Sequence, residues 1–105
     1  MTWPPALTPK GAEDYARNFT DIERSFIINC SSTLTLGYET LSKKLDVTYD
    51  RADVMGCDMQ ARSLGAIKPA RHGNRYAGSG FFLNERGEAV KRAVLSINPD
   101  LRAGL

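Results

Sequence analysis

Apolar residues recur at helical spacing along most of this chain, and polar or turn-forming residues separate the periodic stretches. The first apolar face runs from Tyr15 to Cys30. Thr8 is suited to cap its start, and Pro9 to fill the first helical position, where a missing N–H costs nothing. Because Thr20 and Asp21 can also cap a fresh helix, the stretch predicts either one helix or two short ones.

Two further helices are predicted in the middle of the chain, after a brief strand expected over Leu34–Leu36. Apolar residues at i, i+3 and i+7 from Tyr38 predict a helix over residues 38–45. The second helix is expected over residues 49–64, although Gly56 weakens it by about 1 kcal/mol relative to alanine. Two apolar tracks compete for its buried face: Ala52, Met55 and Met59 form one, and Val54, Cys57, Ala61 and Leu64 form the other.

Residues 66–83 have a different pattern, which predicts a β-hairpin. The stretch from His72 to Arg75 contains glycine and asparagine, which tolerate the positive φ of tight turns. Asn84 is then expected to cap a last helix, which Asn98 and Pro99 end. Its buried face would consist of Val90, Ala93, Val94 and Ile97. The chain is therefore expected to be mainly α-helical with a small β-hairpin.

Length and composition limit what the chain can be. Its 105 residues leave room for a single domain. No apolar run approaches the ~18 residues of a membrane helix, and the N-terminus has no signal-peptide pattern. Cys30 and Cys57 stand far apart without a CxxC spacing, so we expect free thiols in a reducing cytoplasm. These features predict a cytoplasmic protein that makes no contact with a membrane.

Charge is distributed unevenly along the chain. Residues 1–61 hold six Lys/Arg against nine Asp/Glu, and residues 62–105 hold eight against three. Seven of the eight later cations lie between Arg62 and Arg92, around the predicted hairpin. An asymmetry of this kind is typical of a protein with one surface that meets a polyanion.

Three short motifs carry a family resemblance. Leu41–Thr48 reads Leu-Ser-Lys-Lys-Leu-Asp-Val-Thr and is similar to the Leu-Ala-x-x-Leu-Gly-Val-Ser turn of the winged helix-turn-helix superfamily. Gly65-Ala66-Ile67 resembles the Gly-Leu-Ile that ends the family's recognition helix. Phe82–Gly87 resembles the Tyr/Arg-Leu-Thr-Glu-Lys-Gly segment that follows the wing of MarR-type bacterial regulators. The resemblance implies a helix-turn-helix over about 37–65, a wing over about 66–83 and a C-terminal helix over about 84–97.

The resemblance also implies sequence-specific binding of double-stranded DNA. A helix fits the major groove and presents its first residues to base edges, while cations on the wing and on the preceding helix contact phosphates or a minor groove. The expected function is that of a small repressor that occludes a promoter as a homodimer. The candidate DNA contacts are Ser42, Lys43, Lys44, Thr48, Tyr49, Arg51, Lys68, Arg71, His72, Asn74 and Arg75.

Three aspartates on the second helix leave an alternative open. Asp50, Asp53 and Asp58 face only Arg51 and Arg62 as nearby cations, and near phosphates each carboxylate would be repelled. The alternative is a protein–protein interaction module on the same fold, such as a phage-encoded inhibitor or assembly factor. The two hypotheses differ in whether the arginines neutralise these aspartates.

The remaining conspicuous residues do not suggest other chemistry. His72 is the only histidine and no cysteine pair has zinc-ligand spacing, so neither a metal nor a cofactor is expected. No nucleophile–base pair stands out, so the chain is not expected to be an enzyme. The apolar stripe from Tyr15 to Cys30 is interpreted as core, with a homodimer seam as the alternative.

Overall fold

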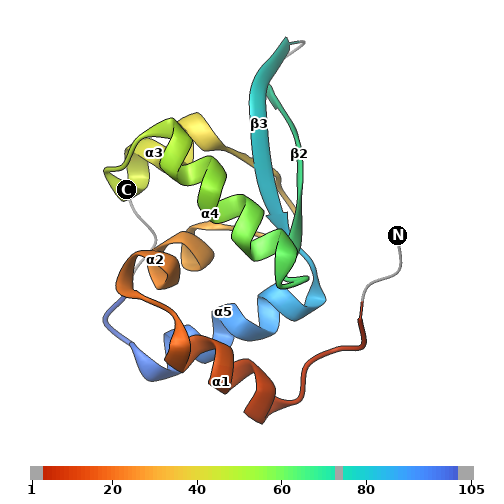
Figure 1. Ribbon diagram of the computed structural model, residues 1–105, viewed down its shortest axis with the longest axis vertical. Helices are drawn as coiled ribbons and strands as arrows, with labels where there is room; N and C mark the ends of the chain where they lie inside the picture. Colours follow the sequence, from red (N-terminus) through yellow and green to blue (C-terminus); the bar gives the residue numbers. More distant parts are fainter. Residues whose placement is uncertain (1–3, 73–74, 102–105) are drawn as a thin grey trace.

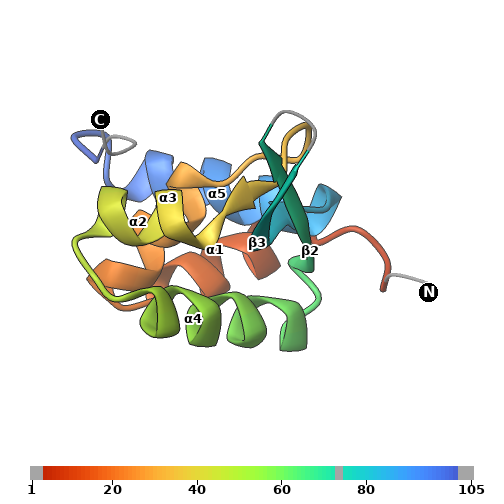
Figure 2. The same cartoon turned by 90° about the horizontal axis from the view of Figure 1, so that it is seen from above.

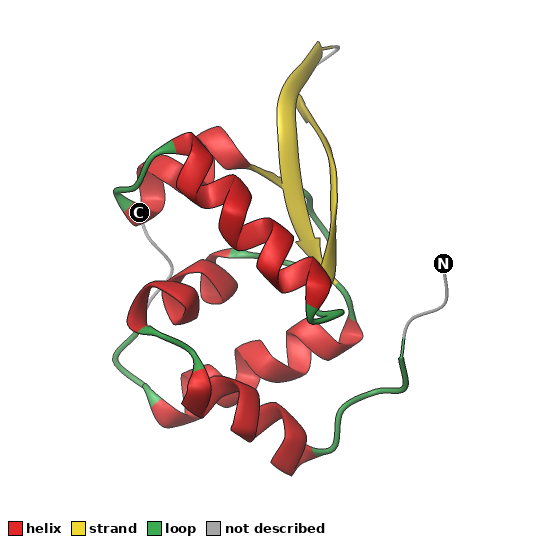
Figure 3. Ribbon diagram, viewed as in Figure 1, coloured by secondary structure: helices red, strands yellow, loops and turns green. Residues whose placement is uncertain are grey.

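The computed structural model describes residues 4–72 and 75–101, with only the backbone described for residues 70–72 and 75–77. Within these residues the chain is mainly helical, with one small antiparallel sheet (Figures 1 and 3). In chain order the elements are α1 (Pro9–Asn18), α2 (Asp21–Asn29), β1 (Leu36–Gly37), α3 (Tyr38–Leu45), α4 (Tyr49–Ala61), β2 (Gly65–His72), β3 (Arg75–Leu83) and α5 (Glu85–Ile97).

The N-terminal apolar stripe forms two helices. The Thr8 hydroxyl accepts a hydrogen bond from the Gly11 amide at 3.1 Å and caps α1. At the start of α2, the Thr20 hydroxyl accepts from the Glu23 amide at 3.3 Å, and the Glu23 carboxylate accepts from the Thr20 amide at 2.8 Å. This reciprocal capping box starts a new helix after Phe19, whose backbone is extended.

Just after each of the two central helices, α3 and α4, one residue has a left-handed backbone. Asp46 has φ 55° after α3, and the amide of Val47 donates to the Ser42 carbonyl at 3.0 Å. Ser63 has φ 58° after α4, and the amide of Leu64 donates to the Met59 carbonyl at 3.1 Å. These bonds have the pattern of the Schellman motif. The prediction that the second helix extends to residue 64 is therefore wrong, because the chain leaves the helix after Ala61.

The sheet joins the hairpin to the short strand before α3. Strand β3 lies between β1 and β2, with Leu36 opposite Phe81 and Gly65 opposite Leu83. The predicted hairpin is confirmed, although residues 73 and 74 of its turn lie outside the described residues. The brief strand begins later than expected, at Leu36. Gly80 permits this pairing because a side chain there would collide with the Leu36 carbonyl.

The helices enclose a core that uses most of the predicted apolar faces. On the first stripe, Phe26, Ile27 and Cys30 are fully or almost fully buried, and the Phe26 ring meets the Phe81 ring edge-on at 5.6 Å between centroids. These stripe residues therefore pack within the chain, as the core interpretation predicted. Helix α1 packs against α5 at the end of the molecule away from the hairpin tip (Figure 1).

The structure also resolves which track of α4 faces inward. Ala52, Met55 and Met59 are buried, whereas Val54 keeps 55% of its surface exposed and Cys57 and Ala61 are exposed too. Leu64, the last member of the other track, is buried, but it lies beyond the end of the helix. In α5, the Asn84 side chain caps the first turn by accepting from the Gly87 amide at 2.8 Å. The predicted inner face of α5 is confirmed: Val90 and Val94 are buried, and Ala93 and Ile97 pack partly buried against the core.

Candidate nucleic-acid interface

The turn between α3 and α4 exposes the first residues of α4. Thr48 is the N-cap, and its hydroxyl accepts from the Arg51 amide at 3.1 Å. Thr48, Asp50 and Arg51 are exposed. A helix start of this kind offers unpaired amides and a partial positive charge, which favour anions. Thr48 and Arg51 are therefore available to a ligand that approaches this end of α4.

Tyr49 ties this helix start to the hairpin. Its hydroxyl accepts a hydrogen bond from the Ser79 amide of β3 at 3.2 Å. Its ring meets the ring of Tyr38 edge-on, with 5.9 Å between centroids. The sequence interpretation made Tyr49 a DNA contact, but the structure gives its hydroxyl a partner within the chain.

The hairpin extends beyond the helices (Figure 1), and from above it stands beside α4 (Figure 2). Lys68 is exposed, with its ammonium 4.5 Å from the centroid of the Phe82 ring. The backbone of Arg71 and His72 lies in β2 and that of Arg75 in β3, where His72 is opposite Arg75. The side chains of these three residues, and all of Asn74, lie outside the described residues.

The outer edge of β2 is protected near its base. The amide of Ile67 donates to the side-chain carbonyl of Gln60 on α4 at 2.9 Å, and Pro69 has no amide hydrogen to offer. These two residues leave the edge poorly suited to pairing with another strand. The Gln60 bond also fixes the base of the hairpin to α4, so α4 contacts the hairpin through both Tyr49 and Gln60.

The candidate DNA contacts on α3 differ in their exposure and in their partners. The Ser42 hydroxyl donates to the Glu39 carbonyl at 2.7 Å. Lys43 is exposed and lies 3.6 Å from the Glu39 carboxylate. Because an exposed ion pair on a helix is worth under about 1 kcal/mol, a phosphate can compete for this lysine. Lys44 is half-buried.

Arg62 does not neutralise the aspartates of α4. Its guanidinium donates to the Glu23 carboxylate on α2 at 2.9 Å and lies 5.2 Å from the centroid of the Phe19 ring. Asp50 and Asp58 are exposed, and the Asp53 carboxylate accepts a long contact from the Cys57 thiol at 3.9 Å. Within the described part of the chain, none of the three aspartates forms a salt bridge.

Sequence reasoning missed the role of Arg62. Its partner Glu23 is remote along the chain, and both residues also fit ordinary roles at the ends of their own helices. The only local signal was the position of Glu23 in the capping box with Thr20. The ion pair therefore anchors the end of α4 to the start of α2 and leaves the exposed face of α4 acidic.

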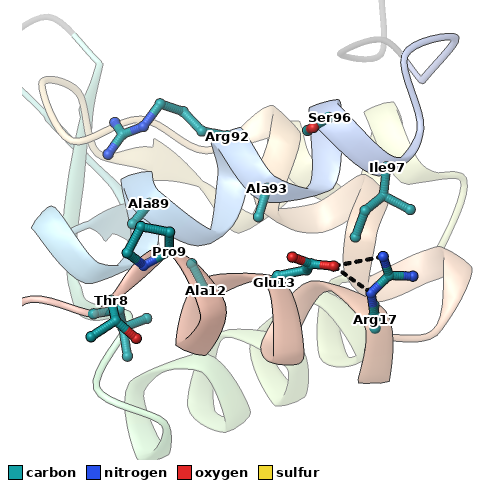
Figure 4. A pocket seen from close by; sticks show the side chains of 11 residues that line it. Thr8, Pro9, Ala12, Glu13, Arg17, Ala89, Arg92, Ala93, Ser96 and Ile97 are labelled. Carbon is teal, nitrogen blue, oxygen red and sulfur yellow. Dashed lines mark hydrogen bonds and ion pairs between the residues drawn. The ribbon is translucent and has the colours of Figure 1, made fainter.

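A hollow of about 690 Å³ lies between α1 and α5, away from the hairpin (Figure 4). Small residues form much of its lining, including Ala12, Ala89 and Ala93, and Arg92 lies at its rim. The Glu13–Arg17 ion pair closes part of one side. None of the candidate DNA contacts lines this hollow.

The described residues also bear on metal binding, membrane insertion and thiol chemistry. Among them, His, Cys, Asp and Glu side chains form no group of three that could hold a metal ion. No helix in this part of the chain is both long and apolar enough to cross a membrane. Cys57 is exposed, whereas Cys30 is buried, and burial raises the pKa of the Cys30 thiol to about 12.

Comparisons with protein-family models, with curated proteins and with solved structures find no match to this chain.

Proposed function

We propose that this chain is a winged helix-turn-helix protein, MarR-like in its wing and following helix, that binds double-stranded DNA sequence-specifically. Its proposed role is that of a small transcriptional repressor that occludes a promoter. The order of the elements supports the proposal: α3, a tight turn, α4, the β2–β3 hairpin and the capped helix α5 follow in the order that the sequence resemblance implies.

The observation that carries the proposal is the hydrogen bond between Tyr49 and Ser79. This bond places the exposed first turn of α4 beside the hairpin, so both can meet one polyanion. Thr48 and Arg51 supply a donor and a cation at the helix start, and Lys68 supplies a cation on the hairpin. A surface of this composition suits a phosphate backbone.

The charge of the hairpin region adds support. From Arg62 to Asn84 the chain contains no acidic residue, and its cations there are Arg62, Lys68, Arg71 and Arg75. The exposed face of α4 is acidic beyond its first turn. We therefore propose that the hairpin supplies most of the phosphate contacts, and that α4 contributes chiefly through Thr48 and Arg51.

The test is binding to mixed-sequence duplex DNA by fluorescence polarisation over a series of salt concentrations. Wild type is compared with Lys68→Ala/Arg71→Ala/Arg75→Ala. The control is Lys10→Ala/Arg92→Ala, which removes exposed cations on α1 and α5 away from the hairpin. We expect binding that weakens steeply with salt, a shallower salt dependence in the hairpin variant and little change in the control. Absence of binding at low salt would overturn the proposal.

A protein–protein interaction module is the second candidate function. One observation favours it: Arg62 pairs with Glu23 and therefore does not pair with the three aspartates of α4, Asp50, Asp53 and Asp58. The same face exposes Val54, an apolar side chain that a partner could cover. This candidate becomes the leading one if wild type fails to bind DNA at low salt, and a pull-down for protein partners is then the next experiment.

A further inference from the structure

We propose that Tyr49 is a positioning residue for DNA binding: it holds the hairpin against the start of α4 and does not itself contact DNA. This inference rests on the proposed function. The sequence suggested that Tyr49 contacts DNA directly. We instead infer that Tyr49 affects DNA binding through the position of the hairpin.

The ring of Tyr49 is held by the helical part of the molecule. It packs edge-on against the ring of Tyr38, whose side chain is fully buried between α3 and α4. Tyr49 itself keeps 39% of its surface exposed. The buried Tyr38 ring limits where the Tyr49 hydroxyl can lie. That hydroxyl accepts a hydrogen bond from the Ser79 amide of β3.

The strand is shaped to meet this hydroxyl. Gly78, the residue before Ser79, has φ +79°, a backbone conformation that residues with a side chain rarely adopt. A Cβ atom at residue 78 would also lie only 2.9 Å from the Tyr49 hydroxyl oxygen. The absence of a side chain at this position therefore lets Tyr49 reach the backbone of β3.

Two hydrogen bonds join the hairpin to α4, in addition to the pairing of β3 with β1. Gln60 holds Ile67 at the base of the hairpin, and Tyr49 holds Ser79 further along β3. With the bond from Tyr49 removed, the base of the hairpin is still held by Gln60 and by the pairing of β3 with β1, and the part of the hairpin beyond Ser79 gains freedom to move. The free protein would then lose part of the arrangement in which hairpin cations and the α4 start meet DNA together.

The test uses the intact chain and variants that break the contact from its two sides. Tyr49→Phe keeps the ring and removes the hydroxyl, whereas Gly78→Ala crowds the hydroxyl without removing any side chain. We expect each to weaken DNA binding about two- to tenfold, the range for one hydrogen bond. The salt dependence should stay that of wild type, because no cation is removed. The double variant should bind no more weakly than the weaker single variant.

Amide hydrogen exchange in the absence of DNA supplies a second readout. Exchange of the Ser79 amide should accelerate in Tyr49→Phe, while amides inside α4 exchange as in wild type. Circular dichroism and the thermal midpoint show whether each variant folds.

Three results would overturn the positioning role. The first is unchanged affinity in a folded Tyr49→Phe variant. The second is a loss of DNA affinity in Tyr49→Phe that is absent from Gly78→Ala, or that adds to the loss of Gly78→Ala in the double variant. Either result indicates direct contact of Tyr49 with DNA. The third, no DNA binding by wild type itself, means that the proposed function has failed. The first two occur only when wild type binds, so the failures are distinguishable.

Discussion

The hydroxyl of Tyr38 on α3 lies directly against Gly56 of α4, so closely that a methyl group at residue 56 would overlap it. Tyr38 is fully buried, and its ring supports that of Tyr49. The glycine that weakens α4 by helix propensity therefore allows α3 and α4 to approach each other. This contact lies beneath the proposed interface and affects the position of its helix start.

Gly56→Ala is expected to destabilise the protein, although alanine is the better helix former by about 1 kcal/mol. The added methyl group overlaps the Tyr38 hydroxyl, and overpacking of this kind typically costs about 1–3 kcal/mol or more. We expect a net loss of about 1 kcal/mol or more in the free energy of unfolding, measured by urea denaturation. Cys57→Ala, at the exposed neighbouring position, should change it by less than about 0.5 kcal/mol. A Gly56→Ala variant more stable than wild type would contradict the contact.

Tyr38→Phe should leave the stability unchanged or raise it by about 1–2 kcal/mol. The Tyr38 hydroxyl is buried and has no hydrogen-bond partner within the described part of the chain, so its removal relieves a desolvation cost. Urea denaturation at neutral pH measures the effect. A loss of more than about 1 kcal/mol would indicate that the hydroxyl makes a stabilising bond.

Tyr38 should also make the stability of the protein depend on pH in the alkaline range. Burial, together with the nearby Asp53 carboxylate, raises the pKa of Tyr38 above its ordinary value of 10.0. A raised pKa in the folded state gives stability that is present below pH 10 and lost as the pH rises above it. Wild type should therefore lose more stability above pH 10 than Tyr38→Phe does. Parallel pH profiles of the two proteins would show that Tyr38 does not contribute.

Glu23→Gln tests the anchor between α2 and α4. Partial burial alone would raise the pKa of Glu23, but hydrogen bonds from Thr20 and Arg62 and the Arg62 charge lower it below 4.5. A lowered pKa gives stability that is present above about pH 4.5 and lost as the pH falls below it. At pH 7 we expect the variant to be less stable by on the order of 1 kcal/mol, a figure reduced for the partial exposure of Arg62.

The difference between wild type and Glu23→Gln should shrink as the pH falls through 4.5. Thermal denaturation over pH 3–7 measures this trend. Glu39→Gln is the matched control, because the Glu39–Lys43 pair is exposed and should contribute little at any pH. An equal pH dependence in both variants would argue against the anchor.

Asp50→Asn and Asp58→Asn serve as controls for each other in DNA binding. Asp50 lies in the first turn of α4 and Asp58 near its other end, and both are exposed. If the first turn faces DNA, removal of the Asp50 charge should strengthen binding about two- to fivefold at low salt, with a smaller gain for Asp58→Asn. Fluorescence polarisation measures both. Equal effects, or none, would indicate that this end of α4 does not approach DNA.

Much of the local structure follows from the sequence because its causes are local. The side chains of Thr8, Thr20 and Asn84 accept hydrogen bonds from amides three residues further along, so each helix start can be recognised from a few neighbouring residues. The hairpin was equally recognisable from its turn residues. For the candidate site, the sequence indicated which residues are charged and in which elements they lie.

Contacts between distant parts of the chain decided the rest. Spacing alone left two tracks of α4 in competition, and packing on the core selected Met55 and Met59. Arg62 had nearby aspartates available, yet pairs with Glu23 because the fold brings the first turn of α2 within reach of its guanidinium. Tyr49, expected from the sequence to contact DNA, accepts a hydrogen bond from β3 because the fold brings Ser79 beside the start of α4. Local sequence patterns therefore specify which elements form and which charges they carry, whereas tertiary packing selects the side chains that remain free to bind a partner.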